Sequence, residues 1–224
     1  MEINLVSQPD YAMAEVDLAA DEQIVVESGS MAAMSSNIEV KTEAKGGIWS
    51  SVKRVAGGEG FFINTYTAEG APGQIFLAPG HPGDIRHFKL SGEELMIQSG
   101  SYIASSPEVE LDTKWGGAKT FFGGEGLFML RASGPGDVLF GSFGAVHEVD
   151  VNGHYSVDTG HIVAFESGLS FKVRKVGGLK SLFLSGEGLI CDFSGQGKLY
   201  LQTRKPASFV HWLNQFRPVK SSND

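Results

Sequence analysis

The apolar residues of this chain occur in short runs that are separated by glycine and small polar residues. The segments "EQIVVESG" and "SFKVRKVGG" alternate well enough for half-buried strands, with Ile24 and Val26 on one face of the first and Phe171 and Val173 on one face of the second. The runs are rich in Val, Ile, Phe and Leu and are bounded by Gly, Ser, Asn or Pro, which is typical of strands and turns. Helical periodicity is weak before residue 206. The pattern therefore predicts a β-rich protein.

One segment near the C-terminus has the period of a helix. Apolar residues at i, i+3, i+4 and i+7 of "PASFVHWLNQFRP" are Phe209, Trp212, Leu213 and Phe216. Pro206 suits a first helical turn and Pro218 suits a helix end. We predict a short amphipathic helix over residues 206–217. We expect its apolar stripe to cover an open end of the β-body or an edge strand, with docking onto a partner subunit as the alternative.

Three segments of the chain align on one another without a gap. They are "SGSMAAMSSNIEV" from Ser28, "SGSYIASSPEVEL" from Ser99 and "TGHIVAFESGLSF" from Thr159. The shared positions are Gly29, Gly100 and Gly160, then Ala33, Ala104 and Ala164, then Ile38, Val109 and Leu169. After each segment come a glycine pair, a glutamate between glycines and a glycine-led apolar run, always in this order. The order predicts three internal repeats.

These repeats predict an all-β fold with a short C-terminal α-helix. We place the repeats at residues 1–91, 92–152 and 153–205 of one compact domain, 1–224. A mostly β unit of this size is too small to bury its apolar faces well by itself. We therefore expect the three units to pack on one another in a pseudo-three-fold arrangement.

A glutamate between glycines occurs once in each repeat, at Glu59, Glu125 and Glu187. Flanking glycines suit a backbone with positive φ, and a carboxylate in such a turn can accept hydrogen bonds from neighbouring N–H groups. We interpret the motif as a structural turn that occurs three times. The alternative is that the three carboxylates converge and bind a cation through oxygen ligands.

The segment "GGIWSSVKRVAGG" combines apolar and basic residues between two glycine pairs. Ile48, Trp49 and Val52 have helical spacing, and Lys53 and Arg54 flank them. Our interpretation is a short helix that caps the β-body. The alternative is an exposed segment that binds a partner or anionic lipid headgroups.

The net charge and the cysteine content restrict which functions and which cellular compartments we expect for this protein. With 18 basic and 26 acidic residues, the formal net charge is −8, which disfavours nucleic-acid binding through clustered lysine and arginine. The single cysteine, Cys191, cannot form an internal disulfide, in agreement with a reducing compartment. The first residues lack a basic leader, and no apolar run is long enough to span a membrane. We expect a cytoplasmic protein.

Catalytic and cofactor motifs do not stand out. The six histidines lack zinc-site spacing, the glycine-rich segments lack the lysine of a P-loop, and no GxSxG element is present. We therefore expect no enzymatic activity, no cofactor and no metal site.

The ordered SG, GG and GEG landmarks, with the ending "LYLQTRKPASFVHWL", carry a family resemblance. From about Ala12 to Phe216 the chain resembles bacterial members of the family named after the yeast altered-inheritance-of-mitochondria protein twenty-four. The resemblance implies three similar β-units, related to subunits of the tryptophan RNA-binding attenuation protein and to the double-stranded β-helix. The bacterial members are uncharacterised, and the fungal relative is linked to inner-membrane organisation. Kinship of fold does not imply RNA binding.

Three functional hypotheses follow. The first is a non-enzymatic scaffold or binding protein, cytoplasmic or peripheral to a membrane, that acts through a protein partner or self-association. The second is a small-ligand- or metal-binding β-barrel, with the possibility of an enzyme. The third, disfavoured by the charge, is RNA binding as in the attenuation protein.

Overall fold

The computed structural model describes residues 1–41, 62–112, 128–175 and 189–217. The fold is mostly β, with strands that curl into half-barrels and one short C-terminal helix within the described residues. The prediction of a β-rich chain is confirmed. The strands belong to three sheets, and every pair of strands is antiparallel.

The first sheet contains residues from the N-terminal part of the chain. Its strands, in order, are β1 (Glu2–Val6), β2 (Met13–Leu18), β7 (Gly73–Leu77) and β4 (Met31–Met34). Along β2, the apolar residues Ala14, Val16 and Leu18 are buried and the residues between them are not. This alternation places one face of the strand in the core.

The second sheet joins the first third of the chain to the middle third. Its strands, in order, are β5 (Ile38–Lys41), β6 (Ile63–Ala68), β3 (Gln23–Glu27), β10 (Tyr102–Ser105), β13 (Pro135–Gly141) and β8 (Ile85–Ser91). The two parts meet where Ala104 of β10 pairs with Val26 of β3.

The third sheet joins the middle third to the last third. Its strands, in order, are β11 (Glu110–Asp112), β12 (Met129–Ser133), β9 (Leu95–Gln98), β15 (Ile162–Glu166), β17 (Leu189–Gln202) and β14 (Val146–Asp158), and β16 (Leu169–Lys175) also pairs with β17. Here Ala164 of β15 pairs with Ile97 of β9.

One irregularity of register occurs in all three sheets. The pairing shifts between Met31 and Ala33 in β4, between Tyr102 and Ala104 in β10, and between Ile162 and Ala164 in β15. Each shift follows one of the SG or TG turns that align in the sequence. An extra residue at a fixed place bends the strand and increases its twist locally. The three aligned segments therefore have the same local backbone pairing.

A side-chain contact to the backbone also recurs after each shift. Backbone N–H groups of Gln74 and Asp137 each donate to a serine Oγ, that of Ser35 and that of Ser106, over 2.9 Å in both cases. In the last third of the chain, the N–H of Lys198 donates to a carboxylate oxygen of Glu166 over 2.8 Å. Ser35, Ser106 and Glu166 lie six residues after the aligned glycines, and each accepts a backbone hydrogen bond through a side-chain oxygen.

The core lies between the curled sheets. Large, fully buried side chains include Tyr102, Phe140, Phe165 and Phe193. One apolar cluster includes residues from both the middle and the last third of the chain, with Phe140 stacked edge-on against Tyr200 at a centroid distance of 5.2 Å. Burial of such a side chain contributes about 1.5–3 kcal/mol. The core is therefore shared across the predicted repeats.

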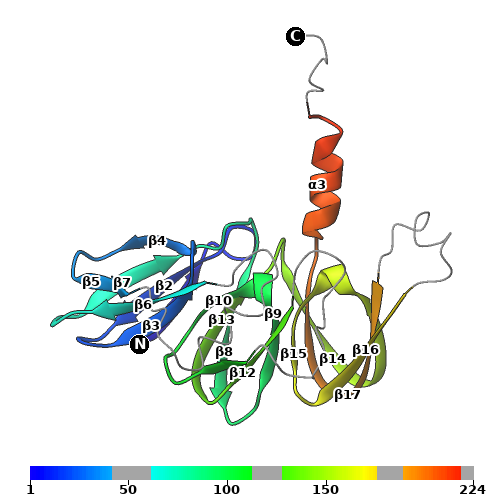
Figure 1. Ribbon diagram of the computed structural model, residues 1–224, viewed down its shortest axis with the longest axis horizontal. Helices are drawn as coiled ribbons and strands as arrows, with labels where there is room; N and C mark the ends of the chain where they lie inside the picture. The colour runs from blue at the N-terminus through cyan, green and yellow to red at the C-terminus, as the bar shows by residue number, and fades with distance from the viewer. Residues whose placement is uncertain (42–61, 113–127, 176–188, 218–224) are drawn as a thin grey trace.

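Three groups of strands follow one another along the long axis of the molecule, with β4 and β5 near one end and β16 near the other (Figure 1). The predicted pseudo-three-fold arrangement is thus corrected to a row within one chain. The physical reason is the edge-to-edge pairing of β3 with β10 and of β9 with β15, which extends the row. The boundary predicted between residues 152 and 153 falls inside β14.

Helix α3 (Pro206–Asn214) begins at the predicted proline and ends before residue 217. It has no buried residue, and it stands away from the β-body (Figure 1). Phe209 packs on Phe143 with a centroid distance of 5.4 Å. The expectation that the apolar stripe covers the β-body is wrong, because Trp212, Leu213 and Phe216 remain about half exposed or more.

Candidate functional site

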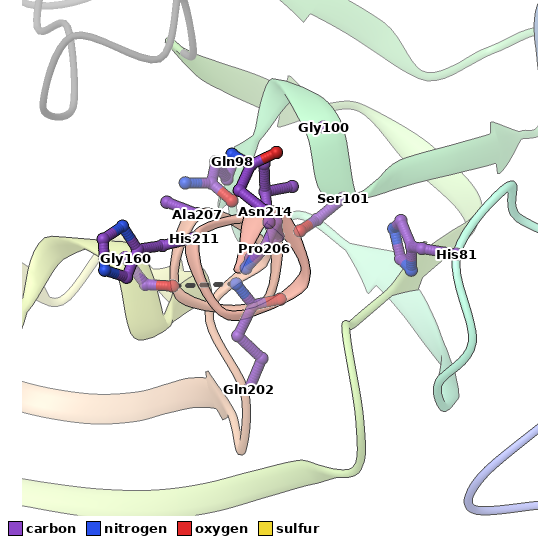
Figure 2. Close-up of a pocket in the computed structure, with 11 residues that line it drawn as sticks. His81, Gln98, Gly100, Ser101, Gly160, Gln202, Pro206, Ala207, His211 and Asn214 are labelled. Carbon is purple, nitrogen blue, oxygen red and sulfur yellow. Dashed lines mark hydrogen bonds between the residues drawn. The ribbon is translucent and has the colours of Figure 1, made fainter. Parts of the chain in front are cut away.

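A pocket of about 520 Å³ lies at the base of α3 (Figure 2). Its residues come from the SG and TG turns, the end of β17, the helix and a loop histidine. The lining residues are His81, Gln98, Gly100, Ser101, Gly160, Gln202, Pro206, Ala207, Val210, His211 and Asn214. The pocket thus lies where the middle and last thirds of the chain meet.

The TG turn is held to the start of α3 by Asp158. This turn forms the short 3-10 helix η2 (Thr159–His161), and the backbone N–H of Gly160 donates to Asp158 Oδ1 over 2.8 Å. Lys205 Nζ, in the residue before the helix, donates to Asp158 Oδ2 over 2.8 Å. Both groups are largely shielded from water, so this charged hydrogen bond stabilises the position of α3.

Gln202 connects three segments around the pocket. Its Nε2 donates to the carbonyl of Gly160 over 2.8 Å, and its Oε1 accepts from the N–H of Phe143 over 2.9 Å. A ring nitrogen of His161 contacts the carbonyl of Gln202 at 2.6 Å. Because the Gln202 side chain is buried and satisfied, it gives this wall of the pocket a defined shape.

His81 lines this pocket and also a second one, of about 300 Å³. The second pocket lies between the SG turn at Gly29 and the SG turn at Gly100. His81 packs edge-on against Phe143 with a centroid distance of 6.3 Å. Its Nδ1 is buried and has no hydrogen-bond partner among the residues that the structure describes. A buried imidazole nitrogen of this kind is available to a bound polar group.

Glu27 lies in the second pocket, at the end of β3. Burial raises the pKa of this carboxyl from its usual 4.5 to about 7, and a hydrogen bond with Ser30 opposes the rise. A carboxyl that titrates near neutral pH is common in functional sites. It also occurs in structural ones, and Gln98 occupies the matching position before the next SG turn. With Glu27 and the Nδ1 of His81 in its wall, the second pocket is suited to a polar ligand that is held by hydrogen bonds.

Neither the cysteine nor the acidic and histidine side chains of the described residues form a reactive or metal-binding site. Cys191 is fully buried, and burial, aided by the charge of Asp192, raises the pKa of its thiol to about 12. A thiol with such a pKa is a poor nucleophile at neutral pH. Within the described ranges, no group of three or more His, Cys, Asp or Glu residues gathers as metal ligands do.

The aromatic side of α3 is the second feature of this region. Phe209 stacks near Trp212 at 5.9 Å, and Trp212 near Phe216 at 5.1 Å. Their exposed fractions are 45%, 52% and 67%. Arg204 and Arg217 flank the helix, and residues 203–217 include no Asp or Glu. An exposed apolar patch with basic flanks indicates an interaction surface.

The structure does not describe the site residues that were singled out from the sequence. The glutamates Glu59, Glu125 and Glu187 are outside the described residues, as are Ile48, Trp49, Val52, Lys53 and Arg54. The structure therefore tests neither the turn nor the cation interpretation, and neither interpretation of the basic segment. The sequence alignment contained one signal for the pockets, since their walls include the aligned glycines Gly29, Gly100 and Gly160.

The described part of the chain has no helix with the length and apolar content needed to cross a membrane.

Comparisons with known proteins match this chain to one family model and to two streptococcal proteins. The family model described as mitochondrial biogenesis AIM24 matches residues 3–204. An uncharacterized protein of Streptococcus pyogenes serotype M6 is 27% identical over 222 residues, which cover 95% of this chain and 89% of that protein. A crystal structure of a Streptococcus pyogenes protein from a structural genomics programme aligns with a TM-score of 0.80 and 23% identity, over 96% of this chain and 99% of that one. This similarity supports the fold.

Proposed function

The chain belongs to the mitochondrial biogenesis AIM24 family, and from this premise we propose that it is a non-enzymatic scaffold that binds a partner protein through α3. Helix α3 projects from the row of β-units, and the pocket at its base gives the partner a second contact. Presentation of a short helix on a rigid β-body suits recognition in which an amphipathic helix enters an apolar groove.

The observation that carries this proposal is the exposure of the apolar side of α3. Five apolar residues of the helix region are at least 45% exposed: Phe209, Val210, Trp212, Leu213 and Phe216. The helix is short, and isolated helices of this length are marginal in water. A bound partner that covers the stripe would supply the missing stabilisation.

The charges around α3 indicate the chemistry of the partner. Arg204 and Arg217 flank the stripe, whereas the chain as a whole has a net charge of −8. A groove with an acidic rim would complement both the apolar stripe and the basic flanks. An anionic membrane surface is the second candidate, because a helix with Trp, Phe and Leu beside basic residues also suits the lipid interface.

The repeated register shifts support a further structural part of the proposal. The scaffold consists of three equivalent β-units, each with one SG or TG turn followed by the same pairing shift. Its kinship with the attenuation-protein subunits and the double-stranded β-helix stays a prediction, as does the absence of enzymatic activity.

Photocrosslinking tests the proposal. A photoreactive residue is placed at Leu213, in the apolar stripe, and in a control at Glu39, which is exposed on β5 at the far end of the β-body. We expect a defined protein adduct from position 213, which Trp212→Glu abolishes, and none from position 39. An adduct pattern that Trp212→Glu leaves unchanged would refute docking through α3.

Vesicle binding distinguishes the membrane alternative. The purified protein and its Trp212→Glu variant are sedimented with phosphatidylglycerol vesicles and with phosphatidylcholine vesicles. Under the proposal, neither form binds either vesicle. Binding to phosphatidylglycerol alone, lost in the variant, would assign α3 to an anionic lipid surface instead of a protein groove.

A further inference from the structure

Neighbouring parts of the chain are joined by one kind of strand pair, which is used twice. Ala104 of β10 pairs with Val26 of β3, and Ala164 of β15 pairs with Ile97 of β9. Both alanines lie four residues after the glycine of their own SG or TG turn, and both partners lie three residues before the glycine of the preceding one. The two junctions therefore have the same register.

The two strand edges that form each internal junction have counterparts at the two ends of the row, in β4 and β14. Ala33 lies four residues after Gly29 in β4, which is the last strand of the first sheet. Val157 lies three residues before Gly160 in β14, which is the last strand of the third sheet. No described strand pairs with the outer edge of either. The two edges lie toward opposite ends of the molecule (Figure 1).

The strand residues at the two internal junctions are buried, whereas several of the matching residues at the two free edges are exposed. All four residues of β10 are buried, whereas no residue of β4 is. Ala104 and Ala164 have no exposed surface, but Ala33 is exposed. At the other end, Tyr155 of β14 is 41% exposed, while Ile24 and Leu95, which match it in β3 and β9, are buried. Both ends thus resemble a junction without its neighbour.

The β4 edge also lacks the usual protection against pairing. Exposed edge strands of soluble proteins generally contain charged residues or proline, which prevent association with another strand. The segment "MAAMSS" at residues 31–36 contains neither. An unprotected edge with the register of an internal junction is a template for strand addition.

We infer that two copies of this chain associate head to tail, with β4 of one copy paired to the second half of β14 of the next. The register of the internal junctions places Ala33 opposite Val157 and Ser35 opposite Tyr155 of the other copy. One continuous sheet then contains β16, β17 and β14 of one copy and β4, β7, β2 and β1 of the next. Such a heterologous contact builds a ring or an open chain of copies. This assembly goes beyond the proposed function and does not involve α3.

Two variants test the contact from its two sides. Ala33→Lys places a long charged side chain where both internal junctions enclose an alanine. Tyr155→Lys places one on the β14 edge, where the internal junctions enclose Ile24 and Leu95. Both positions are exposed in the single chain, so we expect unchanged thermal unfolding of the monomer. Light scattering should show a multiple of 23.9 kDa for the native chain and 23.9 kDa for each variant.

Mixing the variants is the decisive step. The Ala33→Lys chain keeps a normal β14 edge, and the Tyr155→Lys chain keeps a normal β4 edge. A head-to-tail contact therefore predicts that an equimolar mixture forms a dimer of twice 23.9 kDa that grows no further. A monomeric native chain at all accessible concentrations, an assembly that survives either substitution, or a mixture that stays monomeric would each overturn the inference.

Discussion

Asp84 shows how a single buried residue can hold distant parts of this chain together. Its Oδ1 accepts from Gln8 Nε2 over 2.8 Å and from the N–H of Ile85 over 2.9 Å. Its own N–H donates to the carbonyl of Gly144 over 3.0 Å. The Arg86 guanidinium lies 3.2 Å from its other oxygen. A fully buried carboxylate is tolerated here because each neighbour satisfies part of its charge.

We expect Asp84→Ala to lower the free energy of unfolding by about 3 kcal/mol, because it removes the buried carboxylate that faces Arg86 and that accepts from Gln8 and from the N–H of Ile85. Urea unfolding measures the change. Asp17→Ala is the matched control, since Asp17 makes a comparable but exposed hydrogen bond with Gln74, and we expect it to change stability by less than about 1 kcal/mol. Equal effects of the two substitutions would show that burial of Asp84 is not what matters.

Glu27 makes the stability of the protein depend on pH. Its pKa is raised from 4.5 to about 7 in the folded state. Between these values the folded chain retains a proton that the unfolded chain has lost. The free energy of unfolding therefore falls as the pH rises from 4.5 to 7, by at most about 3 kcal/mol.

Glu27→Gln should remove this part of the dependence, as measured by urea unfolding at several pH values. Glutamine is compatible with the site, because Gln98 occupies the matching position in the next SG turn and is buried there. Glu110→Gln, at an exposed position of β11, is the control and should keep the slope of the native chain. An unaltered slope in Glu27→Gln would contradict the assignment.

At the scale of elements, α3 is attached to the β-body at its base alone. Pro206 starts the helix, Lys205 is paired with Asp158, and Phe209 rests on Phe143. The rest of the helix makes few contacts with the sheets and buries no residue. A helix with this little tertiary packing contributes little to the stability of the body.

We expect a chain shortened after Lys205 to unfold within a few °C of the full chain, since about 1 kcal/mol corresponds to about 2–4 °C in a domain of this size. Circular dichroism during heating measures the midpoint. Lys205→Ala in the full chain serves as the comparison, because it removes the hydrogen bond to Asp158 and keeps the helix. A loss of much more than this on truncation would mean that the helix packs on the β-body in solution.

At the scale of the whole molecule, the sheets are not confined to single repeats. The pairs β3–β10 and β9–β15 each combine strands from two parts of the chain. The apolar cluster that includes Phe140 and Tyr200 also crosses such a boundary. Elements that share a sheet and a core lose both together, so their stabilities are coupled.

We therefore expect the described β-body to unfold in one cooperative transition. Differential scanning calorimetry checks this, with a calorimetric enthalpy close to the van't Hoff enthalpy as the expected result. Two resolved transitions would mean that the repeats unfold independently. Ala104→Lys, within the β3–β10 junction, should weaken that coupling and separate the transitions, since Ala104 has no exposed surface.

The sequence alone determined the local features of this protein. The short apolar run that contains Ile24 and Val26 predicted a strand, and the spacing of Phe209, Trp212 and Leu213 predicted a helix, because both patterns are properties of neighbouring residues. The alignment of Gly29, Gly100 and Gly160 located three turns that have the same pairing shift after them.

Only the tertiary structure decided how these elements combine. The row of β-units depends on which strand edges meet, and edge pairing joins residues that are far apart in sequence, such as Val26 and Ala104. The pocket around His81 and Gln202 arises for the same reason, since its walls come from separate turns. The periodicity of α3 identified its apolar stripe, but whether that stripe is buried depends on where the helix leaves the β-body, which no local pattern records.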